Sequence, residues 1–516
     1  MVSLKLGALS VCAAAIVLLA TPLVRAQVTP TVDLGYAQYQ GAVNTDNNIA
    51  HFLGIRFAEP PIGALRFRAP QPPANISGVQ VATTQPIGCS ITEDCLYLNV
   101  YYPSTEGGAP PKNLPTLVWI YGGGYISGQA DGYNGEDIIR QSNNGIVVVV
   151  IQYRLGLFGF LAGSEVKKDG DLNAGLLDQD FALRWVNKYA CISRFGGDPT
   201  KVTIWGESAG AGSVLQQVVA YGGETKPKLF RGAITSSSWL PSQYRFDDLV
   251  PERAFNEVLT QTNCATATDS MSCLRALDTA VLQAVNGNMT SSTFKGTIPF
   301  PPVVDGVFIT QRPTISLLEG KVNGDAFLGV VNAFEGTVFV DQSISITAAN
   351  YSLELFPNFG PAQARTVGAL YAGLGTDQFQ VNAVYGEAIL ICPTYYLLNA
   401  FRGRAFKGEF AIPPALHSMD LVYYFPSLST PPFNNAAFIN AFAQSFTSFI
   451  ISLDPNIKVD PTTITPHWNK FDIGDTEMLF NQTAVDGLPV VQPIETSVGL
   501  LERCLFWDSV GSLTAQ

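Results

Sequence analysis

Residues 195–213, FGGDPTKVTIWGESAGAGS, place the strongest constraint on what this chain can fold into. Residues 201–205, KVTIW, are a short β-branched apolar run, which predicts a buried strand. The pentapeptide G-E-S-A-G follows at 206–210, and residues 213–220 predict the start of a helix. A serine on so sharp a turn presents its hydroxyl at a helix N-terminus, and the flanking glycines let strand and helix approach closely. Ser208 is therefore a candidate nucleophile.

A glycine triplet follows another predicted buried strand, residues 116–121 (TLVWIY). The backbone N–H groups of Gly122, Gly123 and Gly124 are not shielded by side chains, so they can converge on one oxygen atom. The triplet lacks the lysine and the spacing of a phosphate-binding loop. The alternative interpretation is a flexible loop without a chemical role.

Apolar strands alternate with helices along most of the chain. Further strands are predicted at 146–152, 229–235, 325–331 and 404–410, and a long amphipathic helix at 173–194. This alternation predicts an α/β fold with a large, mainly parallel sheet and helices on both faces. Residues 240–320 are rich in predicted helix and would lie above the carboxyl edge of the sheet. We expect residues 27–516 to form one domain, since large α/β enzymes reach this length as one unit.

Two further side chains follow predicted strands in a suggestive order. Glu335 comes directly after the strand at 325–331, and His417 comes after the strand at 404–410. The chain has 3 histidines. His51 lies far upstream of Ser208, and His467 lies in a C-terminal segment that we interpret as structural. His417 thus completes the order serine, acid, histidine. The alternative for Glu335 is a solvated loop residue.

The run F-G-G, four residues, V-x-I-x-G-E-S-A-G resembles the active-site signature of the type-B carboxylesterase/lipase family, which includes the cholinesterases. A second signature, E-D-C-L-Y-L-N at 93–99, and matches from 54–58 to 506–507 extend the resemblance over nearly all of the chain after residue 26. It implies an α/β-hydrolase fold and ester hydrolysis by a triad of Ser208, Glu335 (in E-G-[ST]) and His417 (in H-x-x-[DE]). It also implies an oxyanion hole formed by the N–H groups of Gly123, Gly124 and Ala209.

Residues 1–26 predict a cleaved secretory signal peptide, with Lys5, an apolar run at 6–20 and V-R-A at 24–26. The apolar run is too short for a membrane anchor, the alternative interpretation. Secretion permits disulfides, and Cys89 with Cys95 and Cys264 with Cys273 are close enough in sequence to pair. Cys392 and Cys504 resemble the long-range bridge of cholinesterases. Cys191 is left over, and we interpret it as a buried, inert thiol. Four sequons suit a secreted glycoprotein: Asn75, Asn288, Asn350 and Asn481.

The formal net charge of −12 disfavours nucleic acids and anionic membrane surfaces as partners. Three scattered histidines suggest no metal site, and the expected chemistry needs no cofactor. The partner we expect is a small-molecule ester; the oligomeric state is not readable from sequence.

Only residues 90–94 lie between Cys89 and Cys95, whereas related lipases carry a long lid in this loop and cholinesterases a choline-binding tryptophan. The resemblance is therefore closest to secreted fungal-type carboxylesterases without a long lid. We expect hydrolysis of soluble short- to medium-chain or aromatic-acid esters. The alternatives are a lipase or sterol esterase acting at lipid interfaces, with residues 240–320 as a substitute lid, a feruloyl-type esterase, and a non-catalytic binding protein.

Overall fold

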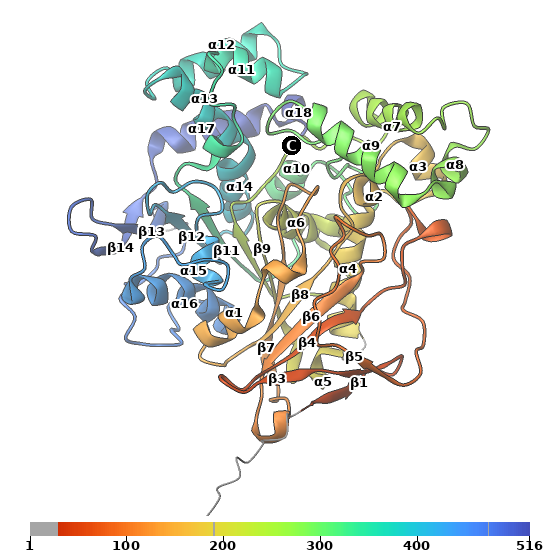
Figure 1. The fold of residues 1–516 in the computed structure, drawn as a ribbon. Helices are drawn as coiled ribbons and strands as arrows, with labels where there is room; N and C mark the ends of the chain where they lie inside the picture. Colours follow the sequence, from red (N-terminus) through yellow and green to blue (C-terminus); the bar gives the residue numbers. More distant parts are fainter. Residues whose placement is uncertain (1–28, 189–190, 473) are drawn as a thin grey trace, which may run out of the picture.

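A twisted sheet of 11 strands forms the centre of the molecule, in the order β14-β13-β12-β11-β10-β9-β7-β8-β6-β4-β3 (Figure 1). The computed structural model describes residues 29–188, 191–472 and 474–516. The strands are β3 Ala42–Asn44, β4 Ile49–Arg56, β6 Tyr97–Pro103, β7 Leu114–Ile120, β8 Val147–Ile151, β9 Gly197–Glu207, β10 Gly232–Ser236, β11 Ala326–Asn332, β12 Ala405–Phe410, β13 Thr476–Gln482 and β14 Pro489–Glu495. A small second sheet contains β1 Thr31–Asp33, β2 Gln38–Gln40 and β5 Val79–Val81.

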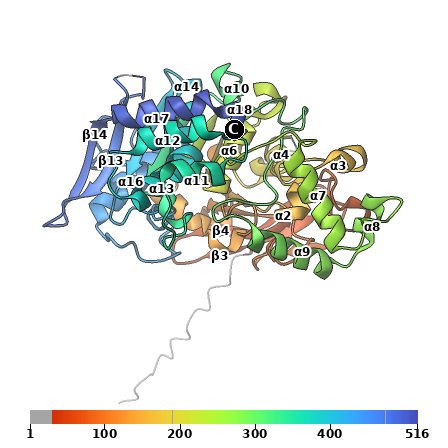
Figure 2. The same cartoon turned by 90° about the horizontal axis from the view of Figure 1, so that it is seen from above.

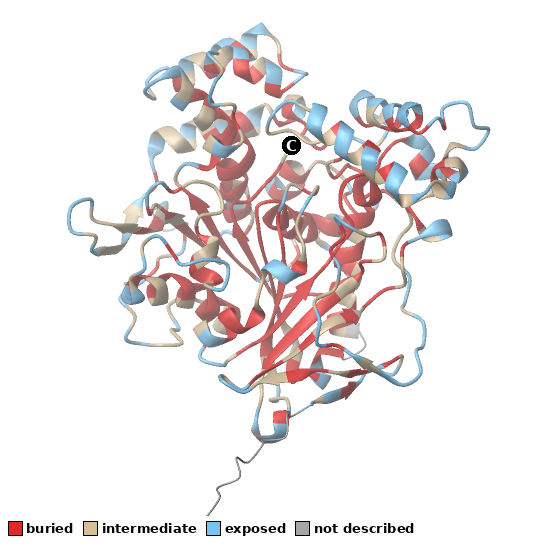
Figure 3. Ribbon diagram, in the orientation of Figure 1, coloured by how far each residue is buried: buried red, intermediate tan, exposed pale blue. Residues whose placement is uncertain are grey.

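Neighbouring strands from β8 through β7, β9, β10, β11 and β12 to β13 are parallel, and the strands at both edges are antiparallel. The interior parallel strands β8, β10 and β11 are entirely buried because helices cover both faces, and β8 consists only of valine and isoleucine, VVVVI. Figure 3 shows this buried layer running through the middle of the molecule. The mainly parallel sheet with helices on both faces is confirmed.

The covering helices form two groups. On one face, α4 Ala174–Lys188 and α6 Ala209–Val219 pack against β9, and α14 Cys392–Ala400 packs against β11 and β12. On the other face, α1 Gly135–Gln141 packs against β6 and β8, and α16 Ala436–Ser452 packs against β7 and β9. The predicted helix at 173–194 corresponds to α4 and, after two residues outside the described ranges, to α5 Cys191–Arg194.

Two clusters of helices lie above the carboxyl ends of the parallel strands, one on each side of the C-terminus (Figures 1 and 2). One contains α7 Leu249–Gln261, α8 Ser270–Ala276 and α9 Thr279–Ser292, within the helix-rich insertion expected at 240–320. The other contains α11 Ala348–Leu355, α12 Pro361–Tyr371 and α13 Asp377–Gly386, and a π-helical turn, η6 Glu387–Ile391, joins α13 to α14. The remaining α-helices are α2 Gly156–Phe160, α3 Ser164–Asp169, α10 Pro313–Leu318, α15 Leu421–Tyr424, α17 Val498–Ser509 and α18 Gly511–Thr514.

Disulfides join the cysteine pairs expected from the sequence: Cys89–Cys95, Cys264–Cys273 and Cys392–Cys504. Cys191 is free and buried, and burial raises the pKa of its thiol to about 12, so it is inert as a nucleophile at neutral pH.

The sequence also predicts a signal peptide and glycosylation sites. The expected signal peptide, residues 1–26 with Cys12, lies outside the described residues. The sequon residues Asn75, Asn288 and Asn350 are exposed, and Asn481 is half-buried on β13; their glycosylation stays a prediction. No helix in the described ranges has the length and apolar character needed to cross a bilayer.

Candidate active site

Ser208 occupies the sharp turn between β9 and α6 that the pentapeptide predicts. Its backbone has φ 57° and ψ −125°, a conformation that non-glycine residues rarely adopt. A Cβ on Gly206 would lie 2.4 Å from the carbonyl carbon of Gly210, and a Cβ on Gly210 would lie 2.0 Å from the carbonyl oxygen of Ile120. Both positions therefore require glycine, because strand, helix and β7 meet there at backbone contact distance.

The helix after the turn begins at Ala209, four residues earlier than the sequence suggests. Glycines at 210 and 212 disfavour helix by intrinsic propensity. Close packing explains them, since a Cβ on Gly212 would lie 2.4 Å from the carbonyl oxygen of Trp239. The early start puts the N–H of Ala209 in the first helical turn, where no intrahelical acceptor exists for it.

The glycine triplet lies directly against this turn. A Cβ on Gly122 would lie 2.9 Å from the Cβ of Ser208. Gly123 and Gly124 have φ values of 101° and 63°, which glycine adopts without strain. Among the described residues, none accepts a hydrogen bond from the backbone N–H of Gly123 or Gly124. With Ala209, these N–H groups are available to a ligand oxygen beside Ser208.

Glu335 begins the turn η5 Glu335–Val338 after β11 and is only 1% exposed. Its Oε2 accepts a hydrogen bond from Nδ1 of His417 at 2.6 Å. Its Oε1 accepts hydrogen bonds from the Ser237 hydroxyl at 2.6 Å and from the N–H of Asn332 at 2.7 Å. Both carboxylate oxygens are thus held by donors, which fixes the orientation of the imidazole of His417.

His417 follows β12, and the Phe339 ring packs edge-on against its imidazole, with 4.8 Å between ring centroids. Its Nε2 is buried and has no hydrogen-bond partner among the described residues, so the structure contains no Ser208–His417 hydrogen bond. Such bonds between catalytic groups commonly tighten only when substrate is bound. A carboxylate oxygen of Glu207, the residue before Ser208, lies 3.3 Å from Nε2.

Glu207 belongs to this site, although we did not expect it from the sequence. Burial raises the pKa of its carboxyl to about 7. Burial alone would lower the pKa of the His417 imidazole, but the negative charges of Glu207 and Glu335 outweigh it and raise that pKa to about 9. The hydroxyl of Ser418, the residue after the histidine, donates a hydrogen bond to Glu207. The available sequence signal was an acidic residue inside G-E-S-A-G.

Ser237 and Asp420 form hydrogen bonds with residues around Glu335 and His417. Ser237 binds the carboxylate of Glu335, as described above, and gave no signal in the sequence. Asp420, the acidic residue of the H-x-x-D motif, contacts neither ring nitrogen of His417; it accepts hydrogen bonds from the side chains of Asn332, at 3.1 Å, and Tyr424, at 3.0 Å. The other two histidines lie elsewhere, His51 on β4 and His467 exposed before the buried Trp468.

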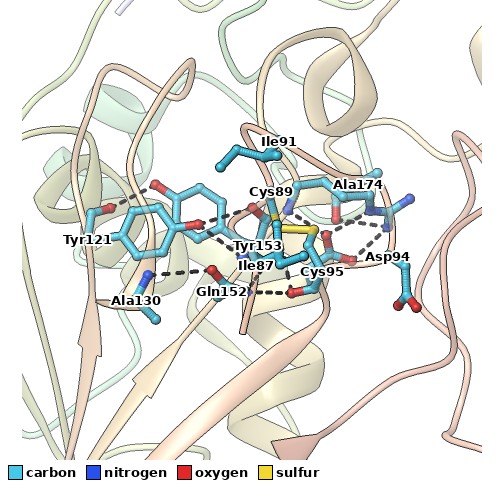
Figure 4. The surroundings of a disulfide bond; sticks show 12 residues. Ile87, Cys89, Ile91, Asp94, Cys95, Tyr121, Ala130, Gln152, Tyr153 and Ala174 are labelled. Atoms are coloured by element: carbon cyan, nitrogen blue, oxygen red, sulfur yellow. Dashed lines mark hydrogen bonds and ion pairs between the residues drawn. A yellow bond between two sulfur atoms is a disulfide. The ribbon is translucent and has the colours of Figure 1, made fainter. Parts of the chain in front are cut away.

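The short Cys89–Cys95 loop is fixed to the body of the protein (Figure 4). The Gln152 side chain donates hydrogen bonds to the carbonyl oxygens of Ile87 and Cys95. Next to it, the Tyr153 hydroxyl donates to the carbonyl oxygen of Tyr121, the residue before the glycine triplet. On the other side of the loop, the Gln283 side chain of α9 donates to the carbonyl oxygen of Ile91.

Helix α9 is itself anchored. Its Asn286 side chain accepts a hydrogen bond from the N–H of Leu157 in α2, and Leu282, Val285 and Met289 are buried. The buried Arg66 guanidinium donates hydrogen bonds to Glu93 of the disulfide loop. It also donates to carbonyl oxygens near the C-terminus of α8, including those of Leu274 and Leu277. The loop and the neighbouring helices thus form one connected structure.

An apolar cavity of about 230 Å³ adjoins the candidate site. One wall is Ile298, whose side chain lies 4.0 Å from the position that a Cβ on Gly124 would occupy. Another wall is Tyr385, whose ring stacks on Phe339 at 4.9 Å between centroids, and Phe339 in turn packs on His417. We call it the substrate-side cavity, because it is bounded by neighbours of both the glycine triplet and the histidine.

Known proteins resemble this chain over most of its length. The carboxylesterase family matches residues 28–355. Secreted lipase 1 of Botryotinia fuckeliana is 33% identical, over 67% of both chains, and lipase 4 of Diutina rugosa is 32% identical, over 84% of this chain and 89% of its own. Carboxylesterase patB of Penicillium expansum is 28% identical over 93% of this chain and 96% of its own.

Among solved structures, that of Aspergillus niger EstA superposes with a TM-score of 0.85 at 32% sequence identity, covering 95% of this chain and 99% of EstA. This likeness confirms the α/β-hydrolase fold expected from the signatures. The chain therefore belongs to the carboxylesterase family and is a carboxylic ester hydrolase with the α/β-hydrolase fold.

Proposed function

We propose that the protein is a secreted serine carboxylesterase that hydrolyses soluble esters through a Ser208–His417–Glu335 triad. The observation that carries this proposal is the 2.6 Å hydrogen bond between the buried Glu335 and His417, beside the strained turn that carries Ser208. Three disulfides suit an oxidising, extracellular environment and support secretion.

In the proposed mechanism, Oγ of Ser208 attacks the ester carbonyl while Nε2 of His417 accepts its proton. The N–H groups of Gly123, Gly124 and Ala209 stabilise the resulting oxyanion. The imidazolium then protonates the leaving alcohol, which departs as the acyl-enzyme forms. Water attacks the acyl-enzyme with His417 again as base, and this releases the acid and restores Ser208. Glu335 holds the imidazole with Nε2 unprotonated and stabilises it when charged.

The size of the substrate-side cavity suggests a substrate ester with one apolar group of modest size. Its volume of about 230 Å³ suits a short or medium chain or a single aromatic ring better than a long acyl chain. Aromatic-acid esters, including feruloyl esters, therefore belong to the proposed range. The second candidate is a lipase acting at lipid interfaces, and the relatives named lipases favour it.

The test is Ser208→Ala. We expect a loss of about 10⁴- to 10⁶-fold in kcat with unchanged fold and thermal stability. A fluorophosphonate probe should label the wild-type protein on the peptide that contains Ser208 and leave Ser208→Ala unlabelled. If the purified variant retained about a tenth of wild-type activity, the nucleophile assignment would be wrong, and labelling of another serine would identify the correct one.

A further inference from the structure

A second cavity, of about 260 Å³, lies behind the turn that carries Glu335. The whole segment 333–337 lines it, together with residues of α13, η6 and α17. Glu335 of the proposed triad is among the lining residues, whereas Ser208 and His417, which carry the reacting atoms, are not. We propose that it is a binding site for a small amphipathic alcohol or phenol, that is, an uncharged molecule with one apolar group and one hydroxyl.

The apolar end of the cavity is aromatic and accessible. Phe334 and Phe379 are 45% and 43% exposed, and their rings meet edge to face with 6.2 Å between centroids. Large apolar side chains this exposed at the edge of a hollow are typical of binding sites, since their burial by a ligand is favourable. Leu374 and Ile391 add apolar surface to the lining. An aromatic ring or short hydrocarbon group fits this end.

The polar end is formed by a largely buried ion pair. Glu387 and Arg503 line the cavity, and their side chains are 7% and 13% exposed. Nε and Nη2 of Arg503 both donate to the Glu387 carboxylate at 2.7 Å. The Tyr371 hydroxyl also donates to Oε2 of Glu387, at 2.7 Å, whereas Nη1 of Arg503 has no hydrogen-bond partner among the described residues. A ligand hydroxyl can donate to Oε1 of Glu387, which accepts only from Nη2 of Arg503 among the described residues, or accept from Nη1 of Arg503.

The charge of the lining selects against ionised ligands. The charged side chains that line the cavity are Glu335, which is paired with His417, and the pair Glu387–Arg503. A ligand carboxylate would face two carboxylates, and a ligand ammonium would face the Arg503 guanidinium. Either ion would also lose its hydration without a free counter-ion. A neutral hydroxyl adds no charge and can still form a hydrogen bond with one member of the Glu387–Arg503 pair.

The two cavities share one wall. Tyr385 and Ile389 line the substrate-side cavity, whereas Gly386, Glu387 and Ile391 line the second cavity. This wall is the end of α13 and the π-helical turn η6, and π-helical turns occur frequently at functional sites. A molecule in the second cavity therefore contacts the segment that limits the space available to substrate.

The second cavity also borders the backbone that positions the acid and the histidine. The backbone of Gly336 packs directly against α13, since a Cβ on Gly336 would lie 1.9 Å from the carbonyl oxygen of Asn382. The N–H of Phe334 donates to the carbonyl oxygen of Ala415, two residues before His417. The proposed alcohol site thus adjoins both triad loops without touching the reacting atoms. An alcohol released by hydrolysis can therefore bind there and alter the activity of the enzyme.

The experiment is a ligand-detected NMR titration of the wild-type protein with 2-phenylethanol, with phenylacetate and 2-phenylethylamine as charged analogues of the same ring. We expect 2-phenylethanol to bind with a Kd of about 1 mM and both ions to bind about tenfold more weakly. Because none of the three is an ester, the titration does not depend on hydrolysis, and its failure would leave the proposed esterase function standing. Equal or tighter binding of either ion would overturn the alcohol assignment.

Variants locate the bound molecule. Ala383→Phe fills the second cavity from α13, and Phe379→Ala removes an exposed ring without disturbing the core. We expect each to weaken binding about tenfold or more. Ile298→Phe, which fills the substrate-side cavity, is the matched control and should leave most of the binding intact. Binding lost in Ile298→Phe but kept in Ala383→Phe and Phe379→Ala would put the alcohol in the substrate-side cavity and overturn the proposal, as would absence of binding.

Discussion

A carboxylate oxygen of Glu207 lies 3.3 Å from Nε2 of His417, the nitrogen proposed to act as the base. Glu335 holds Nδ1 of the same ring at 2.6 Å, so the imidazole lies between two buried carboxylates. Their combined charge outweighs the effect of burial and raises the pKa of His417. This arrangement stabilises the imidazolium that forms when the serine proton is transferred.

The pH dependence of hydrolysis should report this arrangement. The imidazole must be neutral to accept a proton, so kcat/KM should rise with pH through an ionisation above the ordinary histidine pKa of about 6.5. Glu207→Gln removes one negative charge and should move this rise to lower pH. The measurement is the midpoint of the kcat/KM profile between about pH 5 and about pH 10.

Glu409→Gln is the matched control for this profile, because Glu409 is a mostly buried carboxyl on β12 whose charge is not among those that raise the pKa of His417. Its profile should match that of the wild-type protein. A midpoint unchanged in Glu207→Gln would contradict the role assigned to this carboxylate.

Ser237→Ala should slow hydrolysis without unfolding the protein. The Ser237 hydroxyl donates to Oε1 of Glu335, and a hydrogen bond to a charged group contributes about 1.5 to 3 kcal/mol, so we expect a loss of about 10- to 100-fold in kcat. Ser238→Ala is the control, since the neighbouring hydroxyl bonds to Thr235 and Thr394 instead. Similar rates for the two variants would contradict the positioning role of Ser237.

The Cys392–Cys504 disulfide should contribute strongly to stability because the cysteines are 112 residues apart. In the loop-entropy account, a cross-link closing so long a loop is worth on the order of 4 to 5 kcal/mol, and often less in practice. Cys392→Ser and Cys504→Ser should lower the free energy of unfolding by similar amounts in urea titrations, and the double variant should be no worse than either. Additive losses would show that the two cysteines act separately.

Rate against substrate concentration separates the soluble esterase from the interfacial lipase. Residues 90–94 are too few to cover the site, and the anchored helix α9 holds this loop through Gln283. We therefore expect saturation with dissolved tributyrin or vinyl esters and no jump in rate at the solubility limit, nor any preference for choline esters. A sharp rise only above that limit would favour the lipase and a movable cover formed by residues 240–320.

The sequence by itself determined the features that depend on neighbouring residues. The strand, the G-E-S-A-G turn and the helix lie within one short stretch, and the close backbone contacts at Gly206 and Gly210 leave room for no side chain. The apolar parallel strands were predictable because their composition follows directly from burial on both faces. The short disulfide loop was equally visible, because its length is a property of sequence spacing alone.

Only the tertiary structure decided how the surroundings of His417 are built. The hydrogen bond between Ser237 and Glu335 joins residues 98 positions apart in the sequence, and the one between Ser418 and Glu207 joins residues 211 positions apart. No local periodicity encodes such pairs, because they depend on how the ends of separate strands are brought together by the sheet. The second cavity arises in the same way, from a turn after β11, two helices and a π-helical turn. Local sequence specifies which groups the chain carries, whereas the packing of distant segments decides which of them share a buried, low-dielectric environment and so interact strongly.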